Sequence, residues 1–386
     1  MHFKYGTLIQ VDHTRCLNYQ HHGVQCGHCI SQCPGEALYI EGYKIKIDRD
    51  HCLGCGLCFA DCPTEVFKAK GWDETEVVKE VRKQGKEVTK FYCGNHEKPY
   101  LKMDEKDKGA VQLITCLGSL SKVAWYEIGL QTNVELHLEK CSQCSMKSCV
   151  ERIQLAVTTG EEWLRSSGYD PQFSVIHDSD IEDVKKRKRY KAISSGLEVT
   201  SRRDLFLSII GRSKEKVQYI LEKDSLCSNS SYTKKKENYL PNWHRRLVRS
   251  YVLNTREDRI AAYWPSIEKQ SSCIHCGICS RNCPTQTLRT SLHNNKVITT
   301  FTSGTCIDCR ICMLFCPVES IIRDRRPNVN PFKQEVLQEM RVSHCTRCES
   351  LVVENEQSGL CYWCKNEAVE DDLVNDVWNN LIDNKF

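Results

Sequence analysis

The sequence predicts an α+β protein of several small domains, with cysteine-rich modules near both ends and a small parallel α/β domain between them. Three observations lead to this prediction. The chain has 26 cysteines in 386 residues, and all but one fall into clusters. The same cysteine run returns in both modules. Residues 72–182 alternate strand patterns with helix patterns, which is typical of a parallel sheet.

Composition indicates a folded protein of the cytoplasm. Hydrophobic residues make up 40% and charged residues 27%, as in globular domains. No apolar run approaches the roughly 18 residues that cross a bilayer, and Met1–Tyr5 has no apolar core of a signal peptide. Because cytoplasmic thiols stay reduced, we expect the cysteines to bind metal rather than to form disulfides.

The most specific motif lies between residues 273 and 317. It reads C-x2-C-x2-C-x3-C-P twice, from Cys273 to Pro284 and from Cys306 to Pro317. In bacterial ferredoxins a run of this kind holds two 4Fe–4S clusters. Zinc sites use paired C-x2-C knuckles and need neither a third close cysteine nor the Cys-Pro pair, which disfavours zinc here.

Both runs resemble the bacterial dicluster ferredoxins, and the resemblance implies a module at 266–335 that holds two 4Fe–4S clusters. In that family the fourth cysteine of each run ligates the other cluster. The sets implied by position are Cys273, Cys276, Cys279 and Cys316 for one cluster, and Cys306, Cys309, Cys312 and Cys283 for the other.

Residues 1–71 contain a second copy with one departure. The run from Cys52 to Pro63 is complete, but the run ending at Pro34 has Gly23 where its first cysteine is expected. We expect Cys16 to supply that ligand across an enlarged loop; a ligand among His13, His21 and His22, or a 3Fe–4S cluster, is the alternative. The predicted 4Fe–4S sets are Cys16, Cys26, Cys29 and Cys62, and Cys52, Cys55, Cys58 and Cys33. A short helix is expected after each Cys-Pro pair, at 35–38, 64–67, 285–288 and 318–321.

In the middle domain, residues 72–182, cysteines recur where strands are expected to end. The strand patterns are 87–93, 111–116, 134–141 and 173–176, and the helix patterns are 120–130 and 150–164. Since parallel strands end at one edge of a sheet, where ligands bind, Cys93, Cys116 and Cys141 are expected to meet there. Cys144 and Cys149 follow in the next loop. Cys116 is also expected at a helix N-terminus, where the dipole favours a thiolate.

This layout resembles the small iron–sulfur delta subunit of methyl-viologen-reducing hydrogenase, which passes electrons between partners. The resemblance favours one further Fe–S cluster, 2Fe–2S or 4Fe–4S. Its predicted ligands are Cys93, Cys116, Cys141 and Cys144, with Cys149 as the alternate. A zinc site, a domain of buried thiols, or a catalytic thiol at Cys116 or Cys149 are the competing interpretations.

We expect residues 183–265 to form a basic, helical linker. Residues 183–250 carry 18 Lys/Arg against 7 Asp/Glu, and Lys185–Arg189 is the densest run. We interpret this charge as a solvated connector or a surface for an acidic protein; binding to nucleic acid is the alternative. Helices are expected at 204–210 and from Pro241 onward, and Cys227 is expected to be an incidental thiol.

The C-terminal segment combines a metal knuckle with an acidic tail. At 340–366 the pairs Cys345/Cys348 and Cys361/Cys364 are typical of a zinc ribbon or a rubredoxin-like site. Glycine normally follows the second cysteine of a rubredoxin knuckle, whereas Glu349 and Lys365 stand here, which favours zinc over iron. The tail, 367–386, has apolar residues at helical spacing, and we expect it to fold back or to dock on a partner.

Together these features predict an oxygen-sensitive electron-transfer subunit of a cytoplasmic oxidoreductase complex, itself without catalytic residues. The expected cofactors are four 4Fe–4S clusters, one further Fe–S cluster, and zinc or rubredoxin-type iron. We found no dinucleotide fingerprint, phosphate loop or nucleophile triad. Two alternatives remain: a nucleic-acid-associated Fe–S protein that uses the basic linker and zinc ribbon, and a reductase with its active site in the middle domain.

Overall fold

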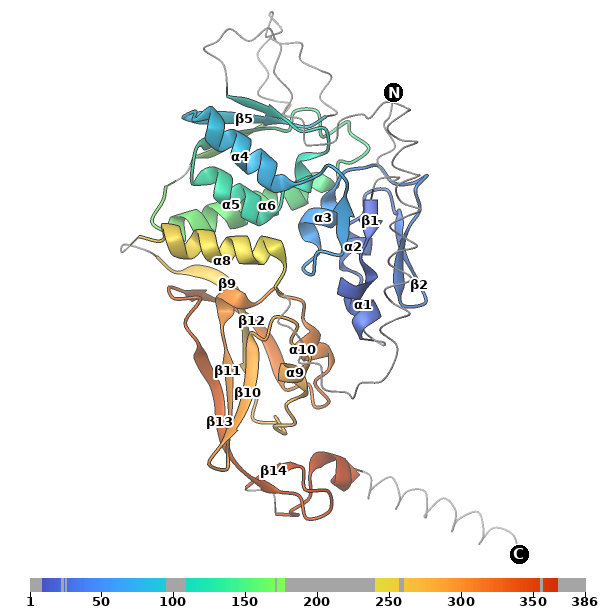
Figure 1. The fold of residues 1–386 in the computed structure, drawn as a ribbon, viewed down its shortest axis with the longest axis vertical. Coiled ribbons are helices and arrows are strands. Elements are labelled where there is room, and N and C mark those ends of the chain that lie inside the picture. Colours follow the sequence, from blue (N-terminus) through green and yellow to red (C-terminus); the bar gives the residue numbers. More distant parts are fainter. Residues whose placement is uncertain are drawn as a thin grey trace, which may run out of the picture. The chain divides into compact units, whose positions relative to one another are not determined.

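The computed structural model describes residues 9–21, 24, 26–94, 109–170, 172–177, 240–256, 260–354 and 357–366. The chain divides into two compact units, residues 1–165 with 169–238, and residues 166–168 with 239–386. The first unit contains the N-terminal cysteine module and the middle domain (Figure 1). The second contains the C-terminal module and the knuckle. The predicted runs 185–189 and 204–210, Cys227 and the tail lie outside the described residues.

The N-terminal module consists of two antiparallel strand pairs and short helices. β1 (Ile9–Val11) pairs with β4 (Phe67–Ala69), so the beginning and the end of the module lie together. β2 (Leu38–Glu41) and β3 (Lys44–Ile47) form a hairpin that turns at Gly42, with a φ of 61°. Its helices are α1 (Leu17–Gln20), α2 (His28–Ser31) and α3 (Leu57–Asp61).

The expectation of a short helix after each Cys-Pro pair is wrong, because the helix precedes the pair. α2, α3, α9 (Ile278–Arg281) and α10 (Ile311–Leu314) all end just before the last cysteine of their run. After each proline the chain turns through a residue with left-handed backbone and then enters a strand. These residues are Glu36, Glu65, Gln286 and Glu319, with φ between 48° and 51°. A left-handed residue cannot continue a right-handed helix, so the chain turns back toward the cysteine.

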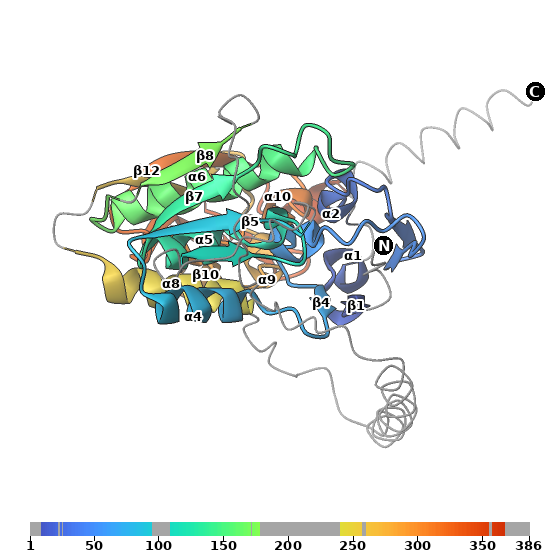
Figure 2. The same cartoon turned by 90° about the horizontal axis from the view of Figure 1, so that it is seen from above.

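The middle domain contains the predicted parallel sheet. All strands are parallel in the order β6-β5-β7-β8, with bounds Ala110–Gln112, Val88–Tyr92, Asn133–His137 and Phe173–Ile176. Figure 2 shows β5, β7 and β8 running side by side. The helices are α4 (Glu74–Gln84), α5 (Lys122–Gly129) and α6 (Cys149–Ser166). The sequence predicts α5, α6 and the strands, but not α4.

One buried apolar cluster joins the sheet of the middle domain to its helices. Phe91 and Leu136 from the sheet, Val77 from α4 and Trp125 from α5 are fully buried in it. α4 begins at Asp73, whose carboxylate accepts from Thr75 N at 2.9 Å, and it ends at Gly85 with a φ of 56°. Such a cap at each end satisfies backbone groups that the helix leaves free.

The second unit starts with α8 (Asn242–Asn254), which confirms the helix expected from Pro241 onward. β9 (Ala262–Lys269) pairs with β12 (Ile321–Asn328), and β10 (Leu288–His293) forms a hairpin with β11 (Lys296–Phe301). These two pairs repeat the pattern of the N-terminal module. β13 (Glu335–His344) adds to β11 and carries the chain to β14 (Leu351–Val353) and the knuckle.

Candidate metal centres

The N-terminal module holds two neighbouring cavities lined with cysteine. One is lined by Cys16, Cys26, Cys29 and Cys62, the set expected for the first cluster. The other is lined by Cys33, Cys52, Cys55 and Cys58, and Cys29 reaches its edge. Cys62 lies with the first set and Cys33 with the second, so the structure brings the fourth cysteine of each run to the cysteines of the other run.

A buried asparagine fixes the enlarged loop that carries Cys16. The Asn18 side chain accepts from Cys26 N at 2.8 Å and donates to Cys26 O at 2.9 Å. These two hydrogen bonds hold α1, the helix that directly follows Cys16, against Cys26. His13 and His21 do not line the cavity, and His22 lies outside the described residues. The role of Asn18 was not predicted; its signal in the sequence was an amide side chain two residues after an isolated cysteine.

The C-terminal module repeats the arrangement. Cys273, Cys276, Cys279 and Cys316 line one cavity, and Cys283, Cys306, Cys309 and Cys312 line the other. Burial and neighbouring cysteine charges, including that of Cys283, raise the pKa of Cys309 and Cys312 to about 12. Burial also raises the pKa of Cys306 well above its usual value.

These buried thiols suit a metal cluster. Burial, together with the charges of neighbouring cysteines, likewise raises the pKa of Cys29 and Cys58. Several thiolates do not stay charged side by side in a buried cavity unless positive charge neutralises them. Iron supplies that charge, so the donor sets fit 4Fe–4S clusters.

In the middle domain the cysteines gather beyond the carboxyl ends of the strands. β6 ends at Gln112 and β7 at His137, so Cys116 and Cys141 lie in the following loops rather than in the strands. Burial first, and then the charges of Cys93, Cys116 and Cys144, raise the pKa of Cys141 to about 12. Cys116 belongs to the buried cluster of this domain, and Cys93, Cys141 and Cys144 all pack against that cluster.

Cys116 precedes a single turn of 3-10 helix, Leu117–Ser119, and not α5 itself. Its sulfur accepts from the backbone N–H of Gly118 at 3.5 Å. α5 begins after Ser121, whose backbone N–H and hydroxyl both donate to Glu74 on α4, at 2.8 and 2.9 Å. The expected helix N-terminus at Cys116 is thus reduced to one hydrogen-bonded turn.

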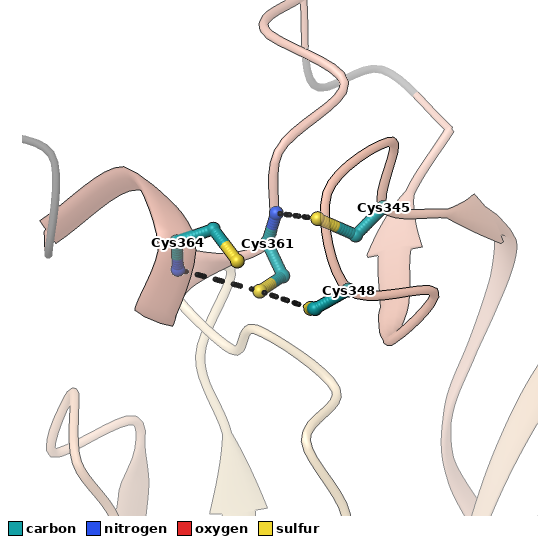
Figure 3. A group of neighbouring side chains, drawn as sticks. All are labelled: Cys345, Cys348, Cys361 and Cys364. Atoms are coloured by element: carbon teal, nitrogen blue, oxygen red, sulfur yellow. Dashed lines mark hydrogen bonds between the residues drawn. The ribbon is translucent and has the colours of Figure 1, made fainter.

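The C-terminal knuckle is the tightest cysteine group (Figure 3). The sulfurs of Cys345, Cys348, Cys361 and Cys364 all lie within 4.8 Å of one another, close enough for one metal ion. None of the other predicted cysteine sets, all within the described residues, gathers this closely. This difference fits the chemistry, because each thiolate of a cubane binds a different iron, whereas four ligands of one zinc share a single ion.

Backbone N–H groups in the knuckle donate hydrogen bonds to the sulfurs that are expected to bind metal. Cys361 N donates to Cys345 Sγ at 3.2 Å and lowers the pKa of the Cys345 thiol to about 6. Cys364 N donates to Cys361 Sγ at 3.5 Å. The hydrogen bond of the Cys364 thiol with Cys348 raises the pKa of Cys364 to about 12, so this cysteine holds its proton until a metal displaces it.

Hydrogen bonds to cluster cysteines recur after the Cys-Pro turns. Ala37 N donates to Cys33 Sγ at 3.3 Å, and Val66 N donates to Cys62 Sγ at 3.5 Å. In the second unit, Ser320 brings both its backbone N–H and its hydroxyl to Cys316 Sγ, at 3.2 and 3.3 Å. Hydrogen bonds to cluster sulfurs help to set the reduction potential. Ser320 stands four residues after Cys316 in the sequence, but its hydroxyl reaches the sulfur of Cys316 because of the left-handed turn at Glu319.

The family described as the 4Fe-4S dicluster domain matches residues 23–66 and 272–320. The chain therefore carries two 4Fe-4S dicluster domains, which implies 4Fe–4S clusters in both modules. Cys16 precedes the first matched segment, and the middle domain and the knuckle lie outside both segments. No curated protein matches the chain significantly. None of the helices that the structure describes is long and apolar enough to cross a membrane.

Proposed function

We propose that this protein is an electron-transfer subunit that relays single electrons through its iron–sulfur clusters to or from a partner oxidoreductase. The observation that carries the proposal is the pair of cysteine-lined cavities in each dicluster domain. When bound, 4Fe–4S clusters accept and donate one electron at a time. Neighbouring cavities in one module suit a relay because they place two such centres close together.

The cavity linings support the ligand sets that the sequence predicts. We assign one cluster to each set of four cysteines, including Cys16 in place of a histidine. The sets are Cys16, Cys26, Cys29 and Cys62; Cys33, Cys52, Cys55 and Cys58; Cys273, Cys276, Cys279 and Cys316; and Cys283, Cys306, Cys309 and Cys312.

For the middle domain we propose a further Fe–S cluster held by Cys93, Cys116, Cys141 and Cys144. The charges of the other three cysteines act on Cys141, which supports this set. The four sulfurs are less closely gathered than those of the knuckle, which disfavours a single zinc ion. For the knuckle we propose structural zinc, because its four sulfurs gather around one point. Cys361 and Cys364 are buried, whereas Cys348 is exposed.

The protein's own residues exclude water and adjust the charge around the thiolates. Ile9, Leu38 and Phe67 pack against the N-terminal cysteines, while Ile267, Leu288 and Phe301 pack against the C-terminal ones. Reduction adds one negative charge to a cluster. Burial makes that charge less favourable and lowers the reduction potential, whereas hydrogen bonds to the sulfurs make it more favourable and raise the potential.

A reducing compartment, the cytoplasm, suits the proposed clusters, because their ligands have to stay free thiols. The middle domain offers little support for a reductase with a catalytic thiol, since Cys116 and Cys149 are both buried. The basic run that would support binding to nucleic acid lies outside the described residues.

Metal and sulfide analysis of the anaerobically purified chain tests the proposal. Four cubanes and a middle cluster predict about 18–20 iron with matching sulfide, and the knuckle predicts about one zinc. Reduction by dithionite is expected to bleach the visible absorption and to produce EPR signals. A chain that holds mainly zinc after reconstitution, with little iron or sulfide, would refute electron transfer.

A further inference from the structure

The four Cys-Pro turns carry different side chains next to their cysteines. The residues two and four positions after the cysteine are Gly35 and Ala37, Thr64 and Val66, Thr285 and Thr287, and Val318 and Ser320. The turn after Cys283 is therefore the one that has a hydroxyl at both positions. Two hydroxyls so close together compete for hydrogen bonds, and this competition decides what Cys283 receives.

Thr285 and Thr287 both line the cavity that Cys283 shares with the second C-terminal set. Both side chains are buried, so their hydroxyls depend on partners inside the protein. The hydroxyl oxygen of Thr285 lies 2.8 Å from that of Thr287 and 3.8 Å from Cys283 Sγ. Within the described residues, these two atoms are the hydrogen-bonding partners of the Thr285 hydroxyl.

The proton of the Thr287 hydroxyl is taken by a backbone carbonyl. Thr287 Oγ1 lies 2.6 Å from the carbonyl oxygen of Thr305, the residue before Cys306. A carbonyl oxygen can only accept, and a hydroxyl has only one proton to donate. Toward Thr285 the Thr287 hydroxyl is therefore an acceptor. The hydroxyl of Thr305, at 2.9 Å, does not change this, because Thr305 donates to Thr302 O at 3.0 Å.

Thr285 consequently donates its proton to Thr287 and not to Cys283. No backbone group replaces that donor. Cys33, Cys62 and Cys316 each accept the backbone N–H of the residue four positions later. In the part of the chain that the structure describes, Cys283 Sγ accepts no backbone N–H.

We propose that Thr287 is a positioning residue that turns the hydroxyl of Thr285 away from Cys283 and thereby keeps the reduction potential of the cluster bound by Cys283 low. This inference rests on the proposed function. A hydrogen bond to a ligand sulfur stabilises the reduced cluster, which carries one more negative charge, and raises its potential. The module thus withholds from Cys283 a donor that lies within reach of it.

Replacing Thr287 by valine tests the inference, because valine has the same shape and stands at the equivalent position in the N-terminal module, Val66. The variant removes the acceptor, so the Thr285 hydroxyl is left with Cys283 Sγ and is expected to rotate toward it. The potential of this cluster is expected to shift to a more positive value. Thr287→Ser keeps the hydroxyl and is expected to leave the potential unchanged.

A double-mutant cycle separates this effect from repacking. Thr285→Val alone is expected to leave the potential unchanged, because its hydroxyl does not donate to Cys283. In the Thr287→Val background the same replacement is expected to abolish the positive shift. Thr290→Val, in β10, is the matched control, since its hydroxyl has no hydrogen-bond partner among the described residues. It is expected to change nothing.

The measurement is an EPR-monitored redox titration of the full chain, reconstituted anaerobically. Cys309→Ala, which removes a predicted ligand of the same cluster, identifies the signal to follow. Iron and sulfide analysis of each variant shows that the cluster is present.

Three outcomes overturn the inference and leave the proposed function intact. They are an unchanged potential in Thr287→Val with full iron content, a positive shift that persists in the double variant, and a negative shift in Thr285→Val alone, which would mean that its hydroxyl already donates to Cys283. The last measurement does not depend on whether Thr287→Val folds. Absence of iron and sulfide from the wild-type protein refutes the proposed function instead.

Discussion

At the scale of single residues, the surroundings of the cysteines differ from one predicted cluster to the next. Cys33 accepts a backbone N–H, whereas Cys316 accepts both a backbone N–H and the hydroxyl of Ser320. Cys62 and Cys283 each have a threonine hydroxyl at 3.6 and 3.8 Å. Since donors to cluster sulfurs stabilise the reduced state, we expect these differences to give the four proposed clusters different potentials.

Replacing Ser320 by alanine removes the hydroxyl donor and leaves the backbone N–H in place. We expect the potential of the cluster bound by Cys316 to fall by roughly 20–60 mV, the equivalent of one hydrogen bond for a one-electron couple. An EPR-monitored titration measures it. Ser291→Ala, at an exposed position in β10, is the matched control. A shift of equal size in the control contradicts the assignment.

Replacing Cys16 by serine tests the unusual ligand. Asn18 holds the enlarged loop against Cys26, and Cys16 is the cysteine of that loop that lines the cavity. We expect a loss of about one to four irons per chain, with a 3Fe–4S signal in the mildest case. Iron analysis and EPR measure it. His13→Ala is expected to keep full iron; if it loses iron and Cys16→Ser does not, the histidine is the ligand.

At the scale of elements, the turns and loops that connect the strands do more than the strands themselves to place the cysteines. The left-handed residue after each Cys-Pro pair returns the chain to its cysteine, and the loops after β6 and β7 bring Cys116 and Cys141 together. Gly56 has a φ of 79° and lies against Ser119, so its conformation and its lack of a side chain both matter.

Gly56→Ala is expected to destabilise the first unit by about 2–5 kcal/mol, from backbone strain plus overpacking. Gly42→Ala is a matched control, because Gly42 has a φ of 61° with nothing within 4 Å of an added Cβ. It is expected to cost only the strain, about 1–2 kcal/mol. Thermal unfolding of the cluster-loaded proteins measures both. Equal losses would mean that Gly56 is not a close contact.

The knuckle is expected to bind metal more weakly as the pH falls. At neutral pH Cys345, with a pKa near 6, is already a thiolate, whereas Cys364, with a pKa near 12, must release a proton to bind. Protons therefore compete with the metal, and affinity changes about tenfold per pH unit for each proton released.

Competition between the protein and a chromophoric chelator for zinc, from pH 6 to pH 8, measures this dependence. Trp363 lies between two of the ligands and is 50% exposed, which makes its fluorescence a second readout. Cys364→Ser is expected to weaken binding and to flatten the pH dependence. An affinity that does not change with pH contradicts the prediction.

At the scale of the whole molecule, the domains differ in how far they depend on metal. Apart from cysteines, the buried cluster of the N-terminal module has few apolar residues, namely Ile9, Leu38, Ile45, Val66 and Phe67. The cluster in the middle domain is larger and spans a sheet and three helices. Small domains with little apolar core need metal or a similar link for stability, so the modules depend on their clusters more than the middle domain does.

Removal of iron is therefore expected to unfold both dicluster modules before the middle domain. In hydrogen exchange of the iron-free chain, the hairpin β2–β3 is expected to lose protection, whereas β5 and β7 keep most of theirs. The cluster-loaded chain under the same conditions is the control. Equal loss of protection in the sheet and in the hairpin contradicts this order.

The cysteine runs, the parallel sheet and the strand at 173–176, which forms over Phe173–Ile176, could be predicted from the sequence. These follow from spacing and periodicity, which neighbouring residues set. The position of the helices before the Cys-Pro pairs, the strand order β6-β5-β7-β8, and the packing of Cys149 in one buried cluster with Cys55 and Cys116 depend on the tertiary structure. Those features depend on contacts between residues far apart in the chain, such as Gly56 with Ser119 and Asp61 with Arg152, and no local pattern records which distant partner will fill a given space.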